Sequence, residues 1–289
     1  MYIFLNGRVV KEAEACISVY DHGFLYGDGI YETMRSYGGV VFMLDRHLER
    51  LARSASLIRL TCPDRKFLRD AVYETMEYNG LSDAYVRVTV SRGKGKIGLD
   101  PRLCKEPTVV IITEGFREYP GSYYQKGTEL IMARTRRNLA EALDPSIKSL
   151  NFLNNILAKT EAIEKGAYEA VMLNRDGYIA EGTVSNIFFV RDERVCTPSR
   201  ETGILEGITR EVTIRVAGNN GIAVTEGMFV PEDIFAAQEV FLTNTTGEVM
   251  PVSRFEHKSY RVGPISRHLH ELYRNEVSRY LEEAKKSGR

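Results

Sequence analysis

Lys148 is the residue whose type and setting point most directly to chemistry. It lies between the turn at residues 144–145 and an amphipathic helix expected to begin near Asn151. This setting predicts an amine held at the mouth of a cleft rather than one extended into water. A lysine that lies near other cations or in a dry pocket loses its proton, and its neutral amine can then form a Schiff base with a carbonyl group. Lys148 is therefore the candidate catalytic residue.

Two polar turns carry groups that bind phosphate. Residues 205–210 place a glycine before a helix, so that the backbone N–H groups of Ile208 and Thr209 can face an anion, and the Thr209 hydroxyl adds a donor. A helix start binds anions through its unpaired donors and through the helix dipole. Residues 243–248 form a second turn rich in hydroxyls, which suits a phosphate or a carboxylate. Such a turn can equally satisfy its own hydrogen bonds, so it identifies no ligand alone.

Glu181 and Arg50 supply two further charges. Glu181 ends a predicted strand and is followed by a glycine. A carboxylate in that place can pair with a protonated ring nitrogen, and the ring then acts as an electron sink for a carbanion. Arg50 lies on a predicted helix, and its planar guanidinium suits bidentate contact with phosphate. Each residue alone is more simply a solvated surface charge, but with Lys148 and the two turns they make up the parts of a pyridoxal phosphate pocket.

Length and composition are those of a globular protein with two domains. The chain has 289 residues, of which 43% are hydrophobic. Basic and acidic residues number 39 each, so no global basic field attracts nucleic acid or a membrane surface. No run of about 18 apolar residues predicts a transmembrane helix, and residues 1–8 lack the basic leader and apolar core of a signal peptide.

The cysteines predict free thiols rather than a cross-linked or metal-bound framework. Cys16, Cys62, Cys104 and Cys196 are scattered without CxxC spacing, and the five histidines are dispersed. We therefore expect no metal site. The cytoplasm is the simplest compartment for such a chain, because thiols stay reduced there.

Periodicity predicts an α+β protein. The clearest elements of the first part are a hairpin around Asn6-Gly7, a short strand at residues 42–44 and a helix capped by Asp45 that runs to about residue 59. Strict alternation over residues 84–91 predicts a half-buried strand. The later elements are expected as strands near residues 128–134, 170–174, 178–180, 186–190 and 240–242, and as helices ending near residue 165 and covering residues 208–219 and 266–285.

One segment has the composition of a linker. Residues 114–125 are rich in Gly, Pro, Tyr and charge, which favours an irregular connection. We therefore expect a small N-terminal domain at residues 1–118, a linker at residues 119–126 and a larger C-terminal domain at residues 127–289, which contains all of the candidate residues named above except Arg50.

The chain resembles the class IV, or fold-type IV, pyridoxal phosphate aminotransferases. Four strings occur in the order and spacing of that family: KSLNFLNNILAKTEA, YIAEGTVSNIFF, LEGITRE and TNTTGEVMPV. The family includes branched-chain aminotransferases, D-amino acid aminotransferases and aminodeoxychorismate lyases. The resemblance implies a small N-terminal α/β domain, a larger C-terminal β-barrel-like domain with helices, pyridoxal 5'-phosphate as the cofactor, and a homodimer or a higher homo-oligomer.

The resemblance also assigns roles to individual residues. Lys148 forms the Schiff base and moves the proton between the substrate Cα and the cofactor, and Glu181 pairs with the pyridine nitrogen. The residues implied for the phosphate are Arg50, Ile208, Thr209 and Thr245. The residues implied for the substrate are Tyr26, Tyr31, Tyr85, Arg87, Thr246 and Gly247, with the last two offering backbone donors to the α-carboxylate.

Within the family, the branched-chain group is the main expectation. Residues 84–87, 91–101 and 17–32 resemble its carboxylate-holding strand, its glycine-rich loop and the segment that leads into its pocket. We expect ping-pong transfer between branched-chain L-amino acids and 2-oxoglutarate, with Arg87 and Tyr26 gripping the acceptor's second carboxylate.

Several residues depart from the branched-chain pattern and leave alternatives open. Tyr31 begins the string Tyr-Glu-Thr-Met-Arg where Phe-Glu-Gly-Ile-Arg is common, Lys96 replaces an acid, and Phe152 replaces a tyrosine. The first departure leans towards the lyase and D-amino acid groups, although no Arg-x-His pair of the D-amino acid kind follows Arg92. The alternatives are therefore a D-amino acid aminotransferase, an aminodeoxychorismate lyase, or a relative that binds the cofactor without catalysis.

Overall fold

The computed structural model of the chain describes residues 1–286, which group into two compact units. Unit 1 contains Met1–Arg117, Ile147–Phe152 and the chain from Tyr280, and unit 2 contains Glu118–Ser146 and Leu153–Arg279. The units therefore differ from the contiguous domains 1–118 and 127–289 expected from the sequence. Within the expected linker 119–126, Gly121–Lys126 forms helix α4. Residues 287–289 of the expected second domain lie outside the described residues.

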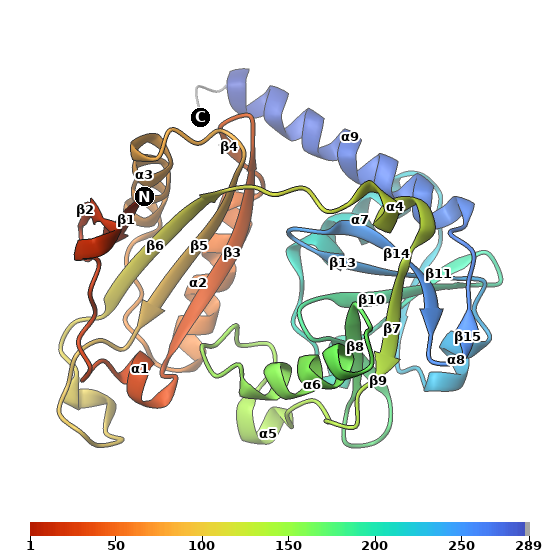
Figure 1. Ribbon diagram of the computed structural model, residues 1–289, viewed down its shortest axis with the longest axis horizontal. Coiled ribbons are helices and arrows are strands. Elements are labelled where there is room, and N and C mark those ends of the chain that lie inside the picture. The colour runs from red at the N-terminus through yellow and green to blue at the C-terminus, as the bar shows by residue number, and fades with distance from the viewer. Residues whose placement is uncertain (287–289) are drawn as a thin grey trace. The chain divides into compact units, whose positions relative to one another are not determined.

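Unit 1 is built on a six-stranded antiparallel sheet with the order β2-β1-β6-β5-β3-β4 (Figure 1). Apolar side chains from one face of this sheet form a single core with helices α2 and α3. The strands are β1 (Tyr2–Leu5), β2 (Arg8–Lys11), β3 (Gly29–Tyr37), β4 (Val40–Val41), β5 (Ala84–Ser91) and β6 (Thr108–Gly115), and the helices are α1 (His22–Tyr26), α2 (Leu44–Leu57) and α3 (Arg65–Tyr78).

Some elements of unit 1 match their prediction and others do not. The Asn6-Gly7 hairpin and the alternating strand β5 are confirmed. The strand expected at residues 42–44 is wrong, because Met43 has a left-handed backbone (φ 53°) and is the N-cap of α2. Asp45 consequently lies in the first turn of that helix instead of capping it. Strand β3 had no prediction, since nearly every residue on both of its faces is buried and no alternation shows in its sequence.

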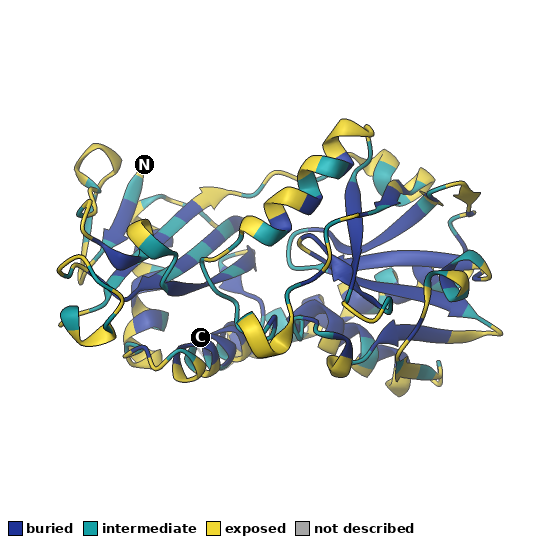
Figure 2. Ribbon diagram, turned by 90° about the horizontal axis from the view of Figure 1, so that it is seen from below, coloured by how far each residue is buried: buried dark blue, intermediate teal, exposed yellow. Residues whose placement is uncertain are grey.

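Unit 2 contains a nine-stranded sheet that curls into a half-barrel (Figures 1 and 2). Its main path is β12-β11-β10-β13-β14-β7-β8-β9, and β15 pairs with β14. The strands are β7 (Thr128–Met132), β8 (Glu169–Leu173), β9 (Ile179–Gly182), β10 (Asn186–Arg191), β11 (Arg194–Pro198), β12 (Val224–Gly227), β13 (Glu239–Asn244), β14 (Glu248–Phe255) and β15 (Lys258–Ser259).

Helices pack against the strands of unit 2. Apolar residues of the central strands form one core, and α6 packs its small residues Ala158 and Ala162 against β7 and β8. The helices are α4, α5 (Ala140–Leu143), α6 (Leu153–Glu164), α7 (Ile208–Asn219), α8 (Pro231–Phe235) and the larger part of α9 (Pro264–Lys286). The mixed α and β composition agrees with the expected fold class.

Residues 1–286 contain neither a membrane-spanning helix nor a cluster of metal ligands. Within that range, no helix combines the length and apolarity that a membrane crossing needs. The same residues contain no group of three or more His, Cys, Asp or Glu side chains placed to hold a metal ion.

Candidate active site

In unit 1, the segment that carries Lys148 is tied to the edge of strand β3. The Tyr31 N–H donates to the Lys148 carbonyl at 3.0 Å, and the Leu150 N–H donates to the Gly29 carbonyl at 2.8 Å. The Lys148 N–H donates to the hydroxyl of Ser54 on α2 at 3.2 Å. These backbone contacts fix the position from which the lysine side chain extends.

Tyr31 lies beside the Lys148 amine and brings Arg87 to the same face of the sheet. The Lys148 Nζ atom is 4.7 Å from the centroid of the Tyr31 ring, and the Arg87 Cζ atom is 4.0 Å from it. Burial raises the pKa of Tyr31 to about 12, although Arg87 opposes the shift. The phenol therefore stays a neutral donor at neutral pH. Phe152 packs edge-on against the same ring, at a centroid distance of 5.7 Å.

Two other predicted substrate residues are also placed in unit 1. Tyr85 follows the alternation of β5, and its hydroxyl lies 3.5 Å from that of Thr33. Tyr26 ends helix α1, and its hydroxyl accepts the Gly98 N–H at 3.1 Å. Tyr85 thus shares a sheet face with Arg87, whereas Tyr26 supports the glycine-rich loop.

Arg50 is held on the opposite, core-facing side of β3. Its Nε and Nη2 atoms donate to the two carboxylate oxygens of Glu32 at 2.7 and 2.8 Å, and the His47 ring lies 2.7 Å from the same carboxylate. Burial alone would raise the pKa of Glu32, but the charges and hydrogen bonds of Arg50 and His47 outweigh it and hold that pKa well below its usual range. These contacts fix the orientation of the Arg50 guanidinium.

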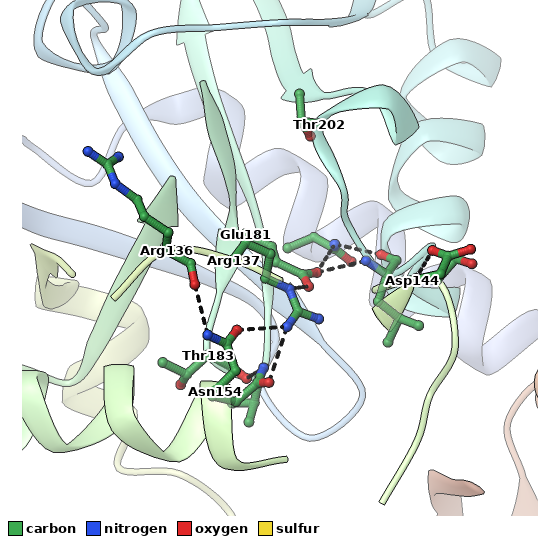
Figure 3. Close-up of polar contacts among 12 residues, drawn as sticks. Arg136, Arg137, Asp144, Asn154, Glu181, Thr183 and Thr202 are labelled. Atoms are coloured by element: carbon green, nitrogen blue, oxygen red, sulfur yellow. Dashed lines mark hydrogen bonds and ion pairs between the residues drawn. The ribbon is translucent and has the colours of Figure 1, made fainter. Parts of the chain in front are cut away.

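In unit 2, Glu181 is a buried carboxylate with donors on both oxygens (Figure 3). Arg137 donates through Nε to Oε1 at 2.9 Å. Oε2 accepts the Leu205 N–H at 3.0 Å and the Asn186 side-chain amide at 3.3 Å. An ion pair and oriented dipoles favour the charged form of a carboxylate. The environment suits a group that must stay negative opposite a pyridinium N–H.

A second buried carboxylate holds the turn that follows Glu181. Glu169 accepts the Val184 N–H at 2.8 Å and the hydroxyls of Thr183 and Ser185 at 3.1 and 2.9 Å. Burial raises the pKa of Glu169, although these three donors oppose the shift. Glu169 therefore stabilises the β9–β10 turn by accepting hydrogen bonds from uncharged donors.

Helix α7 begins at the predicted phosphate-binding turn. Gly207 is its N-cap and makes no side-chain cap, so the first-turn donors of Ile208 and Thr209 are not covered by a capping side chain. A Cβ on Gly207 would stand 2.1 Å from Asn186 Oδ1, so only glycine lets this helix start approach the Glu181 cluster. In the part of the chain that is described, the buried Thr243 hydroxyl has no hydrogen-bond partner. The helix start without a side-chain cap, the Thr243 hydroxyl and the Glu181 carboxylate paired with Arg137 fit the donor and acceptor pattern of pyridoxal phosphate.

The turn containing Thr245, Thr246 and Gly247 connects β13 to β14. The N–H groups of Thr246 and Gly247, expected to face a substrate carboxylate, donate here to Asn244 Oδ1 at 3.1 and 2.6 Å. The side-chain oxygen of Asn244 stands where a carboxylate oxygen would accept, so use of these donors by a substrate requires the Asn244 amide to move.

The structure groups the predicted residues and adds partners that sequence reasoning missed. Lys148, Tyr31, Arg87 and Tyr85 gather around strands β3 and β5 of unit 1. Glu181 and the start of α7 gather around Asn186 in unit 2. The residues missed are Glu32, His47, Arg137, Asn155, Glu169, Asn186 and Asn244. Four of them, Glu32, Asn155, Asn186 and Asn244, lie inside strings quoted for the family, which was the only signal available for them.

The chain matches known proteins over most of its length. The family model described as amino-transferase class IV matches residues 29–255. A Methanocaldococcus jannaschii protein that carries the provisional name of branched-chain-amino-acid aminotransferase is 41% identical, over 95% of this chain and 96% of its own. The aminodeoxychorismate lyase of Bacillus subtilis is 33% identical, over 99% of this chain and 98% of its own.

A solved structure agrees with the fold as well. The branched-chain aminotransferase of the thermophilic archaeon Thermoproteus uzoniensis, solved with norvaline, has a TM-score of 0.91 and 36% identity, and the match covers 96% of this chain and 94% of that one. The fold-type IV architecture expected from the sequence is thereby confirmed, and so is the cofactor class, since class IV aminotransferases use pyridoxal phosphate. The family match spans most of the chain, and the protein belongs to the class IV aminotransferases.

Proposed function

We propose that this enzyme transfers the amino group between branched-chain L-amino acids and 2-oxoglutarate in two half-reactions. The observation that carries the proposal is the position of the Lys148 amine, 4.7 Å from the Tyr31 ring, on the sheet face that Arg87 shares. A proton-transferring amine thus lies beside aromatic surface and one cation. An aliphatic side chain suits the aromatic surface, and a carboxylate suits the cation.

The cofactor residues are proposed as the sequence implies. When bound, pyridoxal phosphate supplies an electron sink for the charge left at the substrate Cα. Lys148 carries the cofactor and, once released, takes the Cα proton through its Nζ atom. Glu181 accepts a hydrogen bond from the pyridine nitrogen. The phosphate residues proposed are Arg50, Ile208, Thr209 and Thr245.

The substrate residues are proposed from their chemistry. Thr246 and Gly247 offer backbone donors to the α-carboxylate after Asn244 moves away. Tyr31 and Tyr85 line the side-chain pocket, and Arg87 with Tyr26 grips the second carboxylate of 2-oxoglutarate. Arg87 is only partly buried and stacks on Tyr31, so its guanidinium edge remains available for a bidentate contact.

A D-amino acid aminotransferase or a lyase is the second candidate. The observation that favours it is the pairing of Tyr31 with Phe152, because the tyrosine hydroxyl lies in a pocket wall that is usually phenylalanine in branched-chain enzymes. A hydroxyl there favours a more polar side chain than leucine. The similarity to a lyase at 33% identity shows that the whole-chain match alone does not separate these activities.

The assembly and compartment are proposed as a cytoplasmic homodimer. The dimer is supported by the family, and the compartment by four free cysteines, of which Cys16 is exposed. A mass twice that of the chain in solution is expected from light scattering.

A panel of half-reactions tests the proposal. Protein loaded with pyridoxal phosphate is mixed separately with L-leucine, L-glutamate, D-alanine and (R)-amines, and the visible absorbance of the cofactor is followed. We expect L-leucine and L-glutamate to bleach the yellow band. Reaction with only the D- or R-compounds would reject the branched-chain proposal, and a yellow protein unchanged by every amine would identify a non-catalytic binding relative.

A further inference from the structure

We propose that Arg137 is a positioning residue that keeps the Glu181 carboxylate ionised and fixed in direction toward the ring nitrogen of the cofactor. The inference rests on the proposed function, in which Glu181 pairs with that nitrogen. Arg137 follows β7 in the chain and lies 44 residues from Glu181, so no motif in the sequence connects the two. Their contact exists only in the folded unit 2.

Glu181 is held at both of its carboxylate oxygens. Arg137 Nε donates to Oε1 at 2.9 Å, while Oε2 accepts from Leu205 and Asn186 (Figure 3). Both charged side chains are buried, with 8% of Arg137 and 6% of Glu181 exposed. Each carboxylate oxygen is therefore bound separately, and the plane of the carboxylate cannot turn without breaking at least one contact.

Arg137 is itself held in place by hydrogen bonds. Its Nη1 atom donates to the side-chain oxygens of Asn154 and Asn155, at 3.2 Å each. The amide of Asn155 donates in turn to the Thr183 carbonyl at 2.7 Å, and that of Asn154 donates to the Arg136 carbonyl at 2.8 Å. Two residues at the start of α6 thus fix the orientation of the Arg137 guanidinium. Such supporting contacts commonly set the orientation and charge of a group that touches a cofactor.

The charges near the Glu181 carboxylate come from several elements. Arg137 supplies a hydrogen-bonding cation, while Leu205 and Asn186 give neutral donors. Glu169 of β8 accepts the Val184 N–H in the turn that follows Glu181, and Lys159 of α6 acts electrostatically on Glu169. On the loop that supplies the Leu205 N–H, Glu206 pairs with Arg200 at 3.1 Å.

The charge balance sets the expected pH dependence. An arginine in contact with a carboxylate favours the ionised form by about 1–3 pKa units. Without Arg137, the buried Glu181 therefore binds a proton at a higher pH. A protonated carboxyl group is neutral and loses its electrostatic attraction to a pyridinium N–H, so cofactor affinity falls first at the acidic end of the range.

The test compares apoproteins of wild type, Arg137→Gln and Arg137→Lys for their affinity for pyridoxal phosphate between pH 5 and pH 8. The matched control is Arg191→Gln. Arg191 is the last residue of β10, the strand that begins at Asn186, and it pairs with Asp233. Melting temperatures of the four apoproteins are measured alongside. If Arg137→Gln does not fold, Arg137→Met takes its place.

We expect Arg137→Gln to weaken binding by about 10- to 100-fold, as the loss of a supporting contact does, with a larger effect at pH 5 than at pH 8. Arg137→Lys keeps a positive charge and should restore the wild-type pH dependence, while Arg191→Gln binds as wild type does. Equal affinity of Arg137→Gln and wild type at every pH would overturn the inference. A wild-type chain that does not bind pyridoxal phosphate would instead overturn the proposed function.

Discussion

At the scale of single residues, two buried carboxylates show how neighbours decide charge. Glu32 is held by Arg50 and His47, and its pKa lies well below the usual range despite burial. Glu169 is held by two hydroxyls and one N–H, and burial raises its pKa. A cation in direct contact reverses the effect of burial, whereas neutral donors only reduce it.

Replacement of Glu169 by glutamine should make the fold less sensitive to pH. Because the pKa of Glu169 is raised in the folded protein, its ionisation opposes folding, and this cost appears as the pH rises above 4.5 through the folded-state value. Glutamine keeps an acceptor for Val184 and carries no charge. The melting temperature of Glu169→Gln should equal that of wild type near pH 4 and exceed it near pH 8.

Glu164 is exposed, so Glu164→Gln serves as the control and should have the melting temperature of wild type at both pH 4 and pH 8. A Glu169→Gln protein that is less stable than wild type at pH 8 would show that the charge itself holds the β9–β10 turn.

Replacement of Glu32 by glutamine should destabilise the folded protein at neutral pH. It leaves Arg50 and His47 around a neutral amide, and loss of one partner of a buried ion pair costs about 3–5 kcal/mol of unfolding free energy. The pKa of Glu32 is lowered from 4.5, so its contribution is present above that pH and is lost as the pH falls through the folded-state value. Denaturant unfolding at pH 7 measures the cost.

The control for Glu32 is Glu49→Gln, which removes an exposed carboxylate from pairs with Arg46 and Arg65. Exposed pairs contribute about 0–1 kcal/mol. Equal losses in the two variants would contradict the structural role assigned to the Glu32–Arg50 pair.

Residue types alone predict groups with intrinsic chemistry but not the residues that contact them. Lys148, Glu181 and the Ile208-Thr209 turn were predicted because an amine, a strand-end carboxylate and a glycine before a helix have meaning in a linear sequence. Arg137 and Glu169 were not found, because their partners are set by the pairing of strands and the start of α6. The contact of Asn244 with the donors of Thr246 and Gly247 was also missed, since a turn sequence does not show which acceptor occupies its N–H groups.

At the scale of elements, the start of α7 depends on one close approach. Gly207 has an ordinary negative φ, so its backbone angles would tolerate alanine, but a Cβ would stand 2.1 Å from Asn186 Oδ1. Since Asn186 also donates to Glu181, a displacement of the Asn186 side chain would disturb the Glu181 carboxylate. The packing of this helix start and the geometry of Glu181 are thus coupled.

Replacement of Gly207 by alanine should cost about 1–3 kcal/mol of stability, as overpacking usually does, and should weaken binding of pyridoxal phosphate. Gly218→Ala on the same helix is the matched control, because no atom lies within 4 Å of its Cβ position. The Gly218→Ala control should instead raise the free energy of unfolding by about 0.5–1 kcal/mol, because alanine is favoured over glycine within a helix. Thermal melts and cofactor titrations of both proteins measure these effects, and a Gly207→Ala protein that binds as tightly as wild type would contradict the coupling.

Strands with local alternation, a tight turn or a continuous apolar run were predictable, and the apolar strands β8, β10 and β13 were expected even though both of their faces are buried. The alternation of β5 and the hairpin of β1 and β2 are patterns that a chain shows locally. Strand β3 lies between β5 and β4, with Tyr31 on one face and Glu32 on the core-facing side. Polar and apolar residues mix on both faces of this strand, so its sequence has no alternation by which to recognise it, although it carries Tyr31 and Glu32.

At the scale of the whole molecule, the expected contiguous domains differ from the compact units. Residues 147–152 follow 29 residues of unit 2, yet Ser149 forms a β-bridge with Ile30 and Lys148 accepts from Tyr31. Composition reveals where a chain is irregular, but it does not reveal that a short segment returns to an earlier sheet. This return places the candidate catalytic lysine beside Tyr31.

The attachment of pyridoxal phosphate to the Lys148 amine is the central claim, and chemical trapping tests it most directly. The protein is loaded with pyridoxal phosphate, reduced with borohydride so that the attachment becomes permanent, digested and mapped by mass spectrometry. We predict one phosphopyridoxyl group per chain, on Lys148, and none on Lys148→Ala treated in the same way. A modified Lys159 or another lysine, with Lys148 left unmodified, would contradict the account.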